Sequence, residues 1–302
     1  MNPVNLPHAP ALPRPAHPGR LAGVLTAASV AALVAALNLG AWAGLNRPLD
    51  LPDWDGPVAG VAYSGFQRDQ DPTRGRFPTD EELAADLDRI AGITGRIRTY
   101  SAVENRAVAT LAPERGLRVT LGAWLDRRAD NNDIEVAAAV HAARDNPGVD
   151  RIMVGNESIL RGDLTVEELA AYLKRVKRFA KKPVSTAEPW HVWLRYPELA
   201  RSVDFITVHL LPYWEGVPRA HAVDYALARY AELKRAFPKK RIVIGEIGWP
   251  SRGDRVGGAV ASPAEQAGFV REFLARTAGE RLDYYLMEMY DQPWKQGAEG
   301  RT

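Results

Sequence analysis

The sequence contains no cysteine, and this absence excludes several kinds of chemistry at once. Without thiols, the chain forms no disulfides, no thiolate metal site and no cysteine nucleophile. Its six histidines show no HExxH or similar metal-ligand spacing. The formal net charge of +2 is too small to predict nucleic-acid binding. What remains is a chain with 46% hydrophobic and 25% charged residues, a composition typical of a well-packed globular protein.

Charge is also missing from one long stretch near the N-terminus. Residues Leu21–Leu45 carry no charged side chain, and the stretch is as long as the ~20 apolar residues that span a bilayer as a helix. Arg14 and Arg20 precede it without any acidic residue, so the positive-inside rule puts Met1 in the cytoplasm. The sequence therefore predicts a single-pass anchor in the cell membrane, with the following domain on the outer, periplasmic side.

Two other interpretations of this apolar stretch are weaker. A cleaved signal peptide would use Ala41-Trp42-Ala43 as an A-x-A site and would release a secreted protein. The uncleaved anchor is favoured, because the apolar run exceeds the ~7–15 residues of a signal-peptide core. A buried core helix is disfavoured, because the run has no polar face.

After a proline-punctuated linker, the sequence alternates between strand and helix patterns. Strands are predicted from short β-branched or apolar runs bounded by turn residues, and helices from apolar residues at helical spacing. The predicted strands are 58–66, 95–101, 118–125, 150–157, 183–188, 204–213, 241–248 and 283–291. The predicted helices are 79–93, 103–115, 134–144, 165–180, 192–202, 222–237 and 262–278. This alternation within roughly 250 residues predicts a (β/α)8 TIM barrel of the α/β class.

The predicted organisation has four parts. They are a cytoplasmic segment at 1–20, a transmembrane anchor at 21–45, a linker at 46–57 and the barrel at 58–302. A doubly wound open sheet is the rival fold, but it would carry a Gly-rich phosphate loop after an early strand, and the sequence has none. No eighth helix is predicted after the last strand. Either an irregular segment such as the linker covers that gap, or the chain is the front part of a longer product.

Two predicted strands end in a glutamate. The run Arg241–Ser251 (RIVIGEIGWPS) contains Glu246, and the run Val149–Ser158 (VDRIMVGNES) contains Glu157. A carboxylate at the end of a buried strand is costly unless it is paired or used. The uncharged stretch around Glu246 argues against a structural ion pair there. Because catalytic groups in such barrels lie at the carboxyl ends of the strands, both glutamates are predicted to face the barrel mouth.

The other predicted strand ends add polar and aromatic side chains to this mouth. They include Tyr63, Arg98, Trp124, Glu188, Trp190, His209, Tyr213, Trp214, Glu288 and Trp294. Two carboxylates suit glycoside hydrolysis, one as proton donor and the other as nucleophile or base. Glu188 and Glu288 are better explained as residues that orient others or as partners of Arg98. His209 fits a hydrogen-bonded core residue as well as a substrate contact.

Two motifs together resemble glycoside hydrolase family 17: the GNE at 155–157 and the GEIGWPS at 245–251. The segments GVAYSGF, RIRTYS, AEPWHVW and EMYDQPWK, at 60–66, 96–101, 187–193 and 288–295, are similar to the bacterial branch of that family. The resemblance covers about Val58–Lys295, nearly all of the chain outside the anchor. It departs from the family pattern where the chain stops before a normal closing helix.

The resemblance implies a retaining mechanism on β-1,3-glucan, with Glu157 as general acid/base and Glu246 as nucleophile. Their carboxyl groups would then lie about 5–5.5 Å apart, whereas a separation near ~9 Å would count against retention. Asn156 would contact the sugar beside the reacting carbon, and Tyr213 would hydrogen-bond the nucleophile. The remaining predicted substrate contacts are Tyr63, Trp190, His209, Trp249 and Glu288. No cofactor and no metal is implied.

Three alternatives stay open. Bacterial relatives of this type are sometimes fused to glycosyltransferase segments, so the first is a β-glucan transglycosylase or branching enzyme with a glycosyltransferase partner. In that case the aromatic rim would hold an acceptor sugar, through Trp190, Trp214, Trp249 and Trp294. The second is a catalytically silent glucan-binding module, although such a module has no need of two glutamates. The third is a barrel glycosidase of another linkage, β-1,4 or β-1,6.

Overall fold

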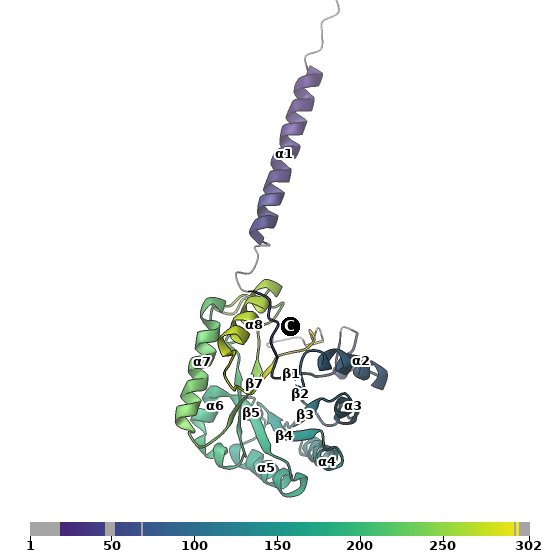
Figure 1. Ribbon diagram of the computed structural model, residues 1–302, viewed down its shortest axis with the longest axis vertical. Coiled ribbons are helices and arrows are strands. Elements are labelled where there is room, and N and C mark those ends of the chain that lie inside the picture. Colours follow the sequence, from purple (N-terminus) through teal and green to yellow (C-terminus); the bar gives the residue numbers. More distant parts are fainter. Residues whose placement is uncertain (1–18, 46–51, 68, 293, 296–302) are drawn as a thin grey trace, which may run out of the picture. The chain divides into compact units, whose positions relative to one another are not determined.

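The computed structural model describes residues 19–45, 52–67, 69–292 and 294–295. The chain divides into two compact units, one containing helix α1 (Gly19–Leu45) and one containing all the strands. Figure 1 shows the second unit as a ring of strands with helices around it.

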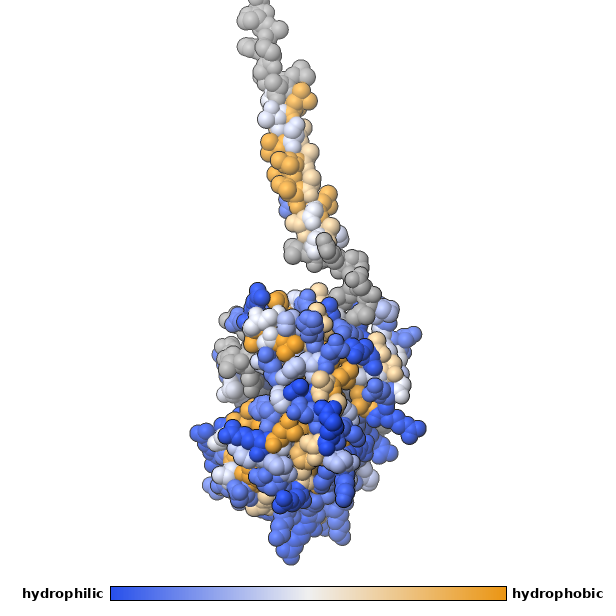
Figure 2. Space-filling model, turned by 90° about the vertical axis from the view of Figure 1, so that its left-hand side faces the viewer, coloured by the Kyte–Doolittle hydropathy of each residue, from blue (hydrophilic) through white to orange (hydrophobic). Residues whose placement is uncertain are grey.

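Helix α1 is one continuous helix, as the uncharged stretch predicts. Residues Gly23–Gly44 are long and apolar enough to cross a membrane, and all their side chains are exposed. Orange and pale apolar residues cover most of this helix in Figure 2, whereas blue polar residues dominate the visible face of the other unit. A helix without a buried face is not the core helix of a globular unit. It is compatible with a membrane anchor or a signal peptide.

The eight strands form a closed parallel barrel in sequence order, β1 through β8, with β8 paired to β1. The strands are β1 (Val61–Ala62), β2 (Arg96–Arg98), β3 (Arg118–Ala123), β4 (Val149–Asn156), β5 (Val184–Pro189), β6 (Ile206–Leu210), β7 (Ile242–Ile247) and β8 (Tyr284–Leu286). The surrounding α-helices are α2 (Asp80–Ala91), α3 (Val108–Glu114), α4 (Ala129–Asp145), α5 (Val166–Ala180), α6 (Trp190–Arg195), α7 (Arg219–Ala236) and α8 (Pro263–Thr277). The predicted TIM barrel is therefore confirmed.

Local sequence signals account for these elements. All six residues of β7 are buried, as expected for a parallel strand covered on both faces. Helices α2 and α5 each begin with a complete capping box, in which a threonine and a glutamate satisfy each other's backbone N–H groups. Their apolar side chains belong to the large buried cluster that helices and strands share, and a second, smaller buried cluster consists of Met153, Ala187, Phe205, Val243 and Tyr285.

Several elements differ from the sequence prediction in their ends. Helix α3 begins at Val108 instead of 103, and helix α4 begins at Ala129 instead of 134. Strand β1 keeps only two residues of the predicted 58–66, and Gly65 beyond it adopts a left-handed backbone with φ of 85°. Strand β8 is also short, at three residues, because the chain beyond it leaves the barrel to line the mouth. Helix α6 begins at Trp190 and ends before Pro197, which begins a 3-10 helix because proline cannot continue an α-helix.

No helix follows β8 within the residues that the structure describes. The preceding linker lies close to this part of the barrel instead. Its Asp53 pairs with Arg271 of α8, and its Trp54 packs against the barrel core. These contacts agree with the expectation that an irregular segment covers the gap.

An ion-pair cluster lies at the amino ends of the strands, whereas the two motif glutamates lie at the carboxyl ends. Asp283, just before β8, contacts three arginines: Arg96 at 2.9 Å, Arg151 at 2.8 Å and Arg241 at 2.5 Å. In parallel barrels this end of the strands serves stability, whereas chemistry takes place at the carboxyl ends.

Candidate active site

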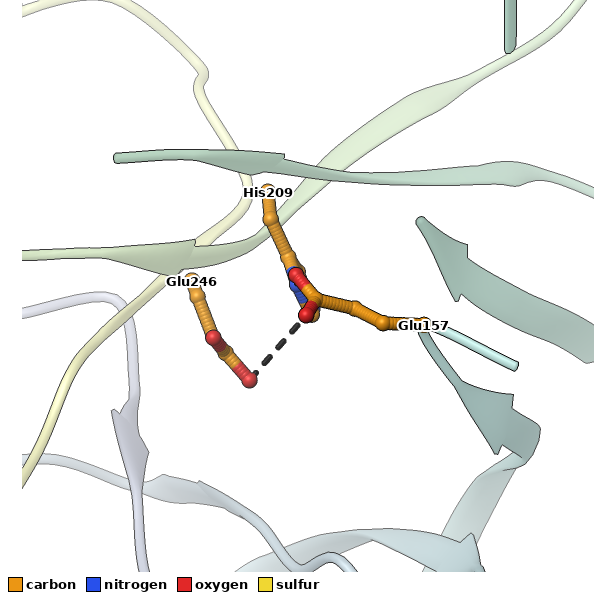
Figure 3. A group of neighbouring side chains, drawn as sticks. All are labelled: Glu157, His209 and Glu246. Atoms are coloured by element: carbon orange, nitrogen blue, oxygen red, sulfur yellow. Dashed lines mark hydrogen bonds and ion pairs between the residues drawn. The ribbon is translucent and has the colours of Figure 1, made fainter. Parts of the chain in front are cut away.

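Three side chains meet at the carboxyl ends of the strands: Glu157 directly after β4, His209 of β6 and Glu246 of β7 (Figure 3). His209 lies between the two glutamates. Its Nδ1 is 2.7 Å from Glu157 Oε1, and its Nε2 is 3.4 Å from Glu246 Oε1. One ligand atom from each of the three residues lies within 4.8 Å of the others. The motif glutamates therefore face each other, as the sequence predicts.

The backbone around Glu157 is held in an unusual conformation. Glu157 has φ of 56°, in the left-handed region that side chains other than glycine rarely adopt, and Gly155 before it has φ of 82°. The Glu157 N–H donates to the Ala187 carbonyl of β5 at 2.7 Å. Such conformations persist only where the surroundings over-determine them, and they gather at functional sites.

Glu188, at the end of β5, fixes the turn that follows Glu157. Its two carboxylate oxygens accept the backbone N–H groups of Ile159 at 2.8 Å and Leu160 at 3.2 Å. Burial raises the pKa of Glu188 to about 7, although these two hydrogen bonds act in the opposite direction. The sequence leaves two interpretations of Glu188, a residue that orients others or a partner of Arg98. The structure agrees with the first, because the carboxylate binds backbone amides of the turn that follows Glu157.

Arg161 ties the same turn to the neighbouring strand. Its Nη2 donates to the Leu125 carbonyl at 2.9 Å, and its Nη1 donates to the Asn156 carbonyl. The guanidinium lies over the Trp124 ring, with its carbon 4.4 Å from the ring centroid. Together these contacts hold the turn after Glu157 against the end of β3.

Glu246 is buried and paired with a cation from the other side of the barrel. Arg98 of β2 is 1% exposed, and its Nη1 donates to Glu246 Oε1 at 2.7 Å and to the Gly245 carbonyl at 2.9 Å. Its Nη2 donates to Asn156 Oδ1. Burial alone would raise the pKa of Glu246, but the His209 and Arg98 charges and the Arg98 hydrogen bond outweigh it and lower that pKa. An ionised, fixed carboxylate suits a nucleophile.

This ion pair is a correction to the sequence analysis, which expects no structural ion pair for Glu246. The stretch around Glu246 is indeed uncharged, but its partner comes from a strand 148 residues away. The sequence places Arg98 at the mouth and cannot show which carboxylate it meets, because the barrel closure decides that contact.

Glu288, beyond β8, is a third buried carboxylate at the mouth, after Glu188 and Glu246. It accepts a hydrogen bond from Ser64 at 2.8 Å, and its Oε2 is 3.6 Å from Lys295 Nζ. Burial raises its pKa, and the nearby Glu246 charge adds to that effect, against the opposing influences of Lys295 and Ser64. Glu288 and Lys295 line a cavity on the β7–β8 side of the mouth, together with Trp214, Trp249, Tyr290 and Asp291.

In three predicted substrate contacts, the hydroxyl group or the ring face already contacts other groups of the protein. The hydroxyl of Tyr63 donates to Asp86 at 3.1 Å, and that residue is 1% exposed. The hydroxyl of Tyr213 donates to the Asp254 carbonyl, and within the described residues it forms no hydrogen bond with Glu246. Both residues thus depart from the predicted roles, because burial requires each hydroxyl to find a protein partner.

Trp249 is the third of these residues. It is 1% exposed, its ring lies against Tyr213 and Phe269 at centroid distances of 5.4 Å and 5.5 Å, and its Nε1 donates to the Val260 carbonyl at 2.8 Å. These contacts fix Trp249 in the cavity wall and leave no exposed ring face for a sugar. The structure corrects the expectation that it is a stacking platform.

Trp190 keeps a partly exposed ring at the β5 end of the mouth. Its Nε1 donates to Glu215, with the nearer oxygen at 3.1 Å, and the Arg229 guanidinium lies 4.8 Å from the ring centroid. Glu215 also accepts a hydrogen bond of 2.6 Å from Tyr225. The ring is therefore held by Glu215, which precedes α7, and by Arg229 on α7.

The spacing of Glu157, His209 and Glu246 would also allow a metal ion to bind. The chemistry of the surroundings is less favourable, because the Arg98 guanidinium already contacts the Glu246 oxygen at 2.7 Å and would repel a second cation. The arrangement suits acid–base and nucleophilic work by the side chains themselves. One oxygen of Glu157 lies within 4.8 Å of one oxygen of Glu246. This separation is close to the spacing of about 5–5.5 Å between the carboxyl groups of retaining enzymes.

Comparison with known proteins agrees with this chemistry. Residues 60–302 match the family model described as BtgE/BtgC glycoside hydrolase domain. A glucan 1,3-beta-glucosidase of Arthroderma benhamiae is 27% identical over 288 residues, covering 89% of this chain and 84% of that protein. A probable glucan endo-1,3-beta-glucosidase btgC of Aspergillus clavatus is 25% identical over 72% of this chain, which spans only 36% of that protein's length.

Solved structures give the same result. The glycoside hydrolase family 17 beta-1,3-glucanosyltransferase of Rhizomucor miehei superposes with a TM-score of 0.71 and 28% identity, covering 81% of this chain and 91% of that chain. An endo-laminarinase of Formosa superposes with a TM-score of 0.69 at 19% identity, covering 80% of each chain, and shows the shared fold.

Proposed function

The chain belongs to the BtgE/BtgC glycoside hydrolase domain family, and on that basis we propose that it acts on β-1,3-glucan with retention of configuration. The observation that carries the proposal is the facing pair of carboxylates, whose oxygens lie within 4.8 Å with His209 between them. The names of the Arthroderma and Rhizomucor proteins, which are similar to this chain, support the same substrate.

In the proposed first step, a Glu246 oxygen attacks the anomeric carbon of the retained, glycone-side sugar. The glycosidic C–O bond breaks, and Glu157 donates a proton to the leaving oxygen. Glu246 suits the nucleophile because Arg98 and His209 lower its pKa despite burial. Glu157 suits the proton donor because its side chain is 21% exposed, against 6% for Glu246, and can exchange protons with solvent.

In the second step, a hydroxyl attacks the same carbon, the bond to Glu246 breaks and Glu157 takes the proton. Water as attacker gives hydrolysis, and a sugar hydroxyl gives transglycosylation. Transfer is the second candidate function, because the Rhizomucor structure at 28% identity is named a glucanosyltransferase. Asn156, whose side-chain oxygen is fixed by Arg98, is proposed to contact the sugar beside the reacting carbon.

The test is incubation of the full-length chain, in detergent, with laminari-oligosaccharides of defined length, with products followed by mass. Only shorter products would establish a hydrolase, and longer products would establish a transglycosylase. If neither forms while β-1,4- or β-1,6-glucan is cleaved, the linkage assignment is wrong. If no glucan is cleaved and a Glu246→Gln variant binds glucan as well as the parent chain, the protein is a binding module.

We further propose that α1 anchors the chain in the cell membrane, with 46–57 as linker and the barrel at 58–302 on the outer side. Arg14 and Arg20 before the apolar run support this orientation. Intact-mass measurement of the chain in both the membrane fraction and the secreted fraction distinguishes an anchor from a signal peptide. An uncleaved chain supports the anchor, whereas a chain beginning at Gly44 would show cleavage after the A-x-A site.

A membership in the bacterial branch and a glycosyltransferase partner remain part of the proposal. The motifs at 60–66, 96–101, 187–193 and 288–295 support the branch, while several of the named relatives are fungal. Copurification of a membrane glycosyltransferase with the full-length chain, lost when α1 is replaced by an unrelated membrane helix, would support the partner. Purification of the chain alone under the same conditions would contradict it.

A further inference from the structure

An aromatic cluster outside the catalytic pair lies at the β8–β1 side of the mouth. Phe66, four residues beyond the end of β1, is 1% exposed, and its ring centroid is 5.8 Å from those of both Phe77 and Trp294. Phe77 is 48% exposed, and Trp294 is partly exposed. We call these three residues the aromatic shelf. Phe66 forms its buried base, and the other two rings form its surface.

The loop that carries Phe77 is held in place by side-chain hydrogen bonds. Gln67 Nε2 donates to Asp86 of α2 at 2.5 Å, and Gln70 Nε2 donates to Glu82 of α2 at 3.0 Å. Asp71 accepts the Thr73 N–H at 2.9 Å and closes a short 3-10 turn. Phe77 is thus presented by a fixed loop, so a ligand that binds it does not have to order the chain first.

The other exposed ring is fixed as well. Gln292 is 2% exposed; its Nε2 donates to the Phe66 carbonyl at 2.9 Å, and its Oε1 accepts the Trp294 indole N–H at 2.6 Å. One buried amide therefore couples the base of the shelf to its surface. A shelf built in this way has a single arrangement, as is typical of a preorganised binding surface.

The aromatic shelf continues from the active site on the nucleophile's side. Lys295 Nζ lies 5.9 Å from the Trp294 ring centroid and 3.6 Å from Glu288, which lines the cavity on the β7–β8 side of the mouth. In the closed barrel β8 adjoins β7, which carries Glu246, whereas β4, which precedes Glu157, lies across the barrel. The shelf and the predicted acid/base are therefore on opposite sides of the cleavage point.

We propose that the aromatic shelf binds distal sugars of the donor glucan on the retained, glycone side. The inference rests on the proposed function, in which Glu246 bonds the retained sugar and Glu157 stands at the leaving group. Glucose rings present flat, largely apolar C–H faces, which bury favourably against aromatic rings. The shelf would thus select donors with several sugars beyond the reacting one. Trp294 then contacts the donor chain, not the acceptor that the sequence analysis assigns to it.

A purely structural role accounts for only part of the shelf. No helix covers the β8–β1 seam in the described part of the chain, so buried Phe66 is explained as a seal. Phe77 is not explained as a seal, because about half of its surface is exposed to solvent. A single exposed phenylalanine is not unusual in itself, and Phe179 of α5 is exposed to the same 48%. Phe179 therefore provides a matched control that lies away from the mouth.

The experiment compares Phe77→Ala with Phe179→Ala in the full-length chain, using kcat/KM for laminaritriose and laminarihexaose. We expect Phe77→Ala to lower kcat/KM for the longer donor about tenfold, as for loss of an aromatic contact residue, and to leave the shorter donor within about twofold. Phe77→Tyr should restore the long-donor value, and Phe179→Ala should change neither. Thermal stability should be the same for both alanine variants.

Equal losses on both donors, or no loss on either, would overturn the shelf assignment while leaving the proposed function intact. A parent chain that turns over no laminari-oligosaccharide would instead refute the proposed function. In that event, direct titration of the Phe77→Ala variant with laminarihexaose still tests the shelf. Unchanged affinity relative to the parent chain would overturn it, and weaker affinity would support a glucan-binding shelf.

Discussion

Replacing Arg98 by methionine removes the buried cation that holds Glu246 in place. Arg98 is 1% exposed and donates to the Glu246 carboxylate at 2.7 Å, so its loss leaves a buried charge without its main partner. Breaking a buried ion pair by removing one member costs about 3–5 kcal/mol. We expect the free energy of unfolding at neutral pH, measured by urea denaturation, to fall by about that amount.

The same substitution should change how stability and activity depend on pH. In the parent chain the lowered pKa of Glu246 contributes stability that is present at neutral pH and is lost as the pH falls through that pKa. Without Arg98, burial raises the pKa. The stability difference between the two chains should therefore shrink as the pH falls. The acid limb of kcat/KM should move to higher pH, because Glu246 has to ionise before it can attack.

Arg96→Met is the matched control, since Arg96 lies on the same strand. Its partner Asp283 keeps two further arginines, Arg151 and Arg241, so its loss should cost only about 1 kcal/mol, as for a partly exposed pair. It should leave the acid limb unchanged. An unshifted acid limb in Arg98→Met, or a stability loss that stays constant with pH, would refute the assigned coupling between Arg98 and Glu246.

Two further predictions concern the carboxylates. Glu246→Gln and Glu157→Gln should each lower kcat at least ~1,000-fold, since groups acting as a catalytic unit fail together; a loss below tenfold in steady-state assays would contradict the pairing. Glu157→Gln should change stability little, whereas Glu246→Gln leaves buried Arg98 without its carboxylate and should cost about 3–5 kcal/mol. For Glu188, burial raises the pKa from 4.5 to about 7, so the folded state holds an extra proton and stability declines as the pH rises between those values. Glu188→Gln should flatten that part of the urea-unfolding profile, and a profile that keeps the slope would exclude Glu188 as its source.

The sequence predicted the barrel because its strands and helices alternate with strong local signals. Strand β7 and helix α5 were predicted to within about two residues, where buried runs and capping boxes mark the ends. Strand ends at the mouth were predicted less well. The stretch around β1 is apolar enough to continue the strand, but Gly65 turns the chain into the site.

The two glutamates could be predicted because each lies at the end of an apolar run, where an unpaired carboxylate is costly unless it has a function. The residues that contact this site could not be predicted from the sequence. Arg98 meets Glu246 across the barrel, and Glu188 binds backbone amides of Ile159 and Leu160. Such contacts depend on barrel closure and on a turn whose conformation leaves no local pattern. Burial likewise excludes Trp249 as a stacking surface for a sugar, and the sequence does not show whether the ring face of a tryptophan is exposed or packed.

The most direct test of the central claim is to trap the glycosyl-enzyme. The full-length chain would be incubated with an activated 2-deoxy-2-fluoro laminaribiosyl donor, digested and analysed by mass spectrometry. We predict a covalent adduct on the peptide that contains Glu246, absent from the Glu246→Gln variant. An adduct on any other residue, or turnover of a normal donor with inverted product configuration and no adduct, would contradict a retaining mechanism through Glu246.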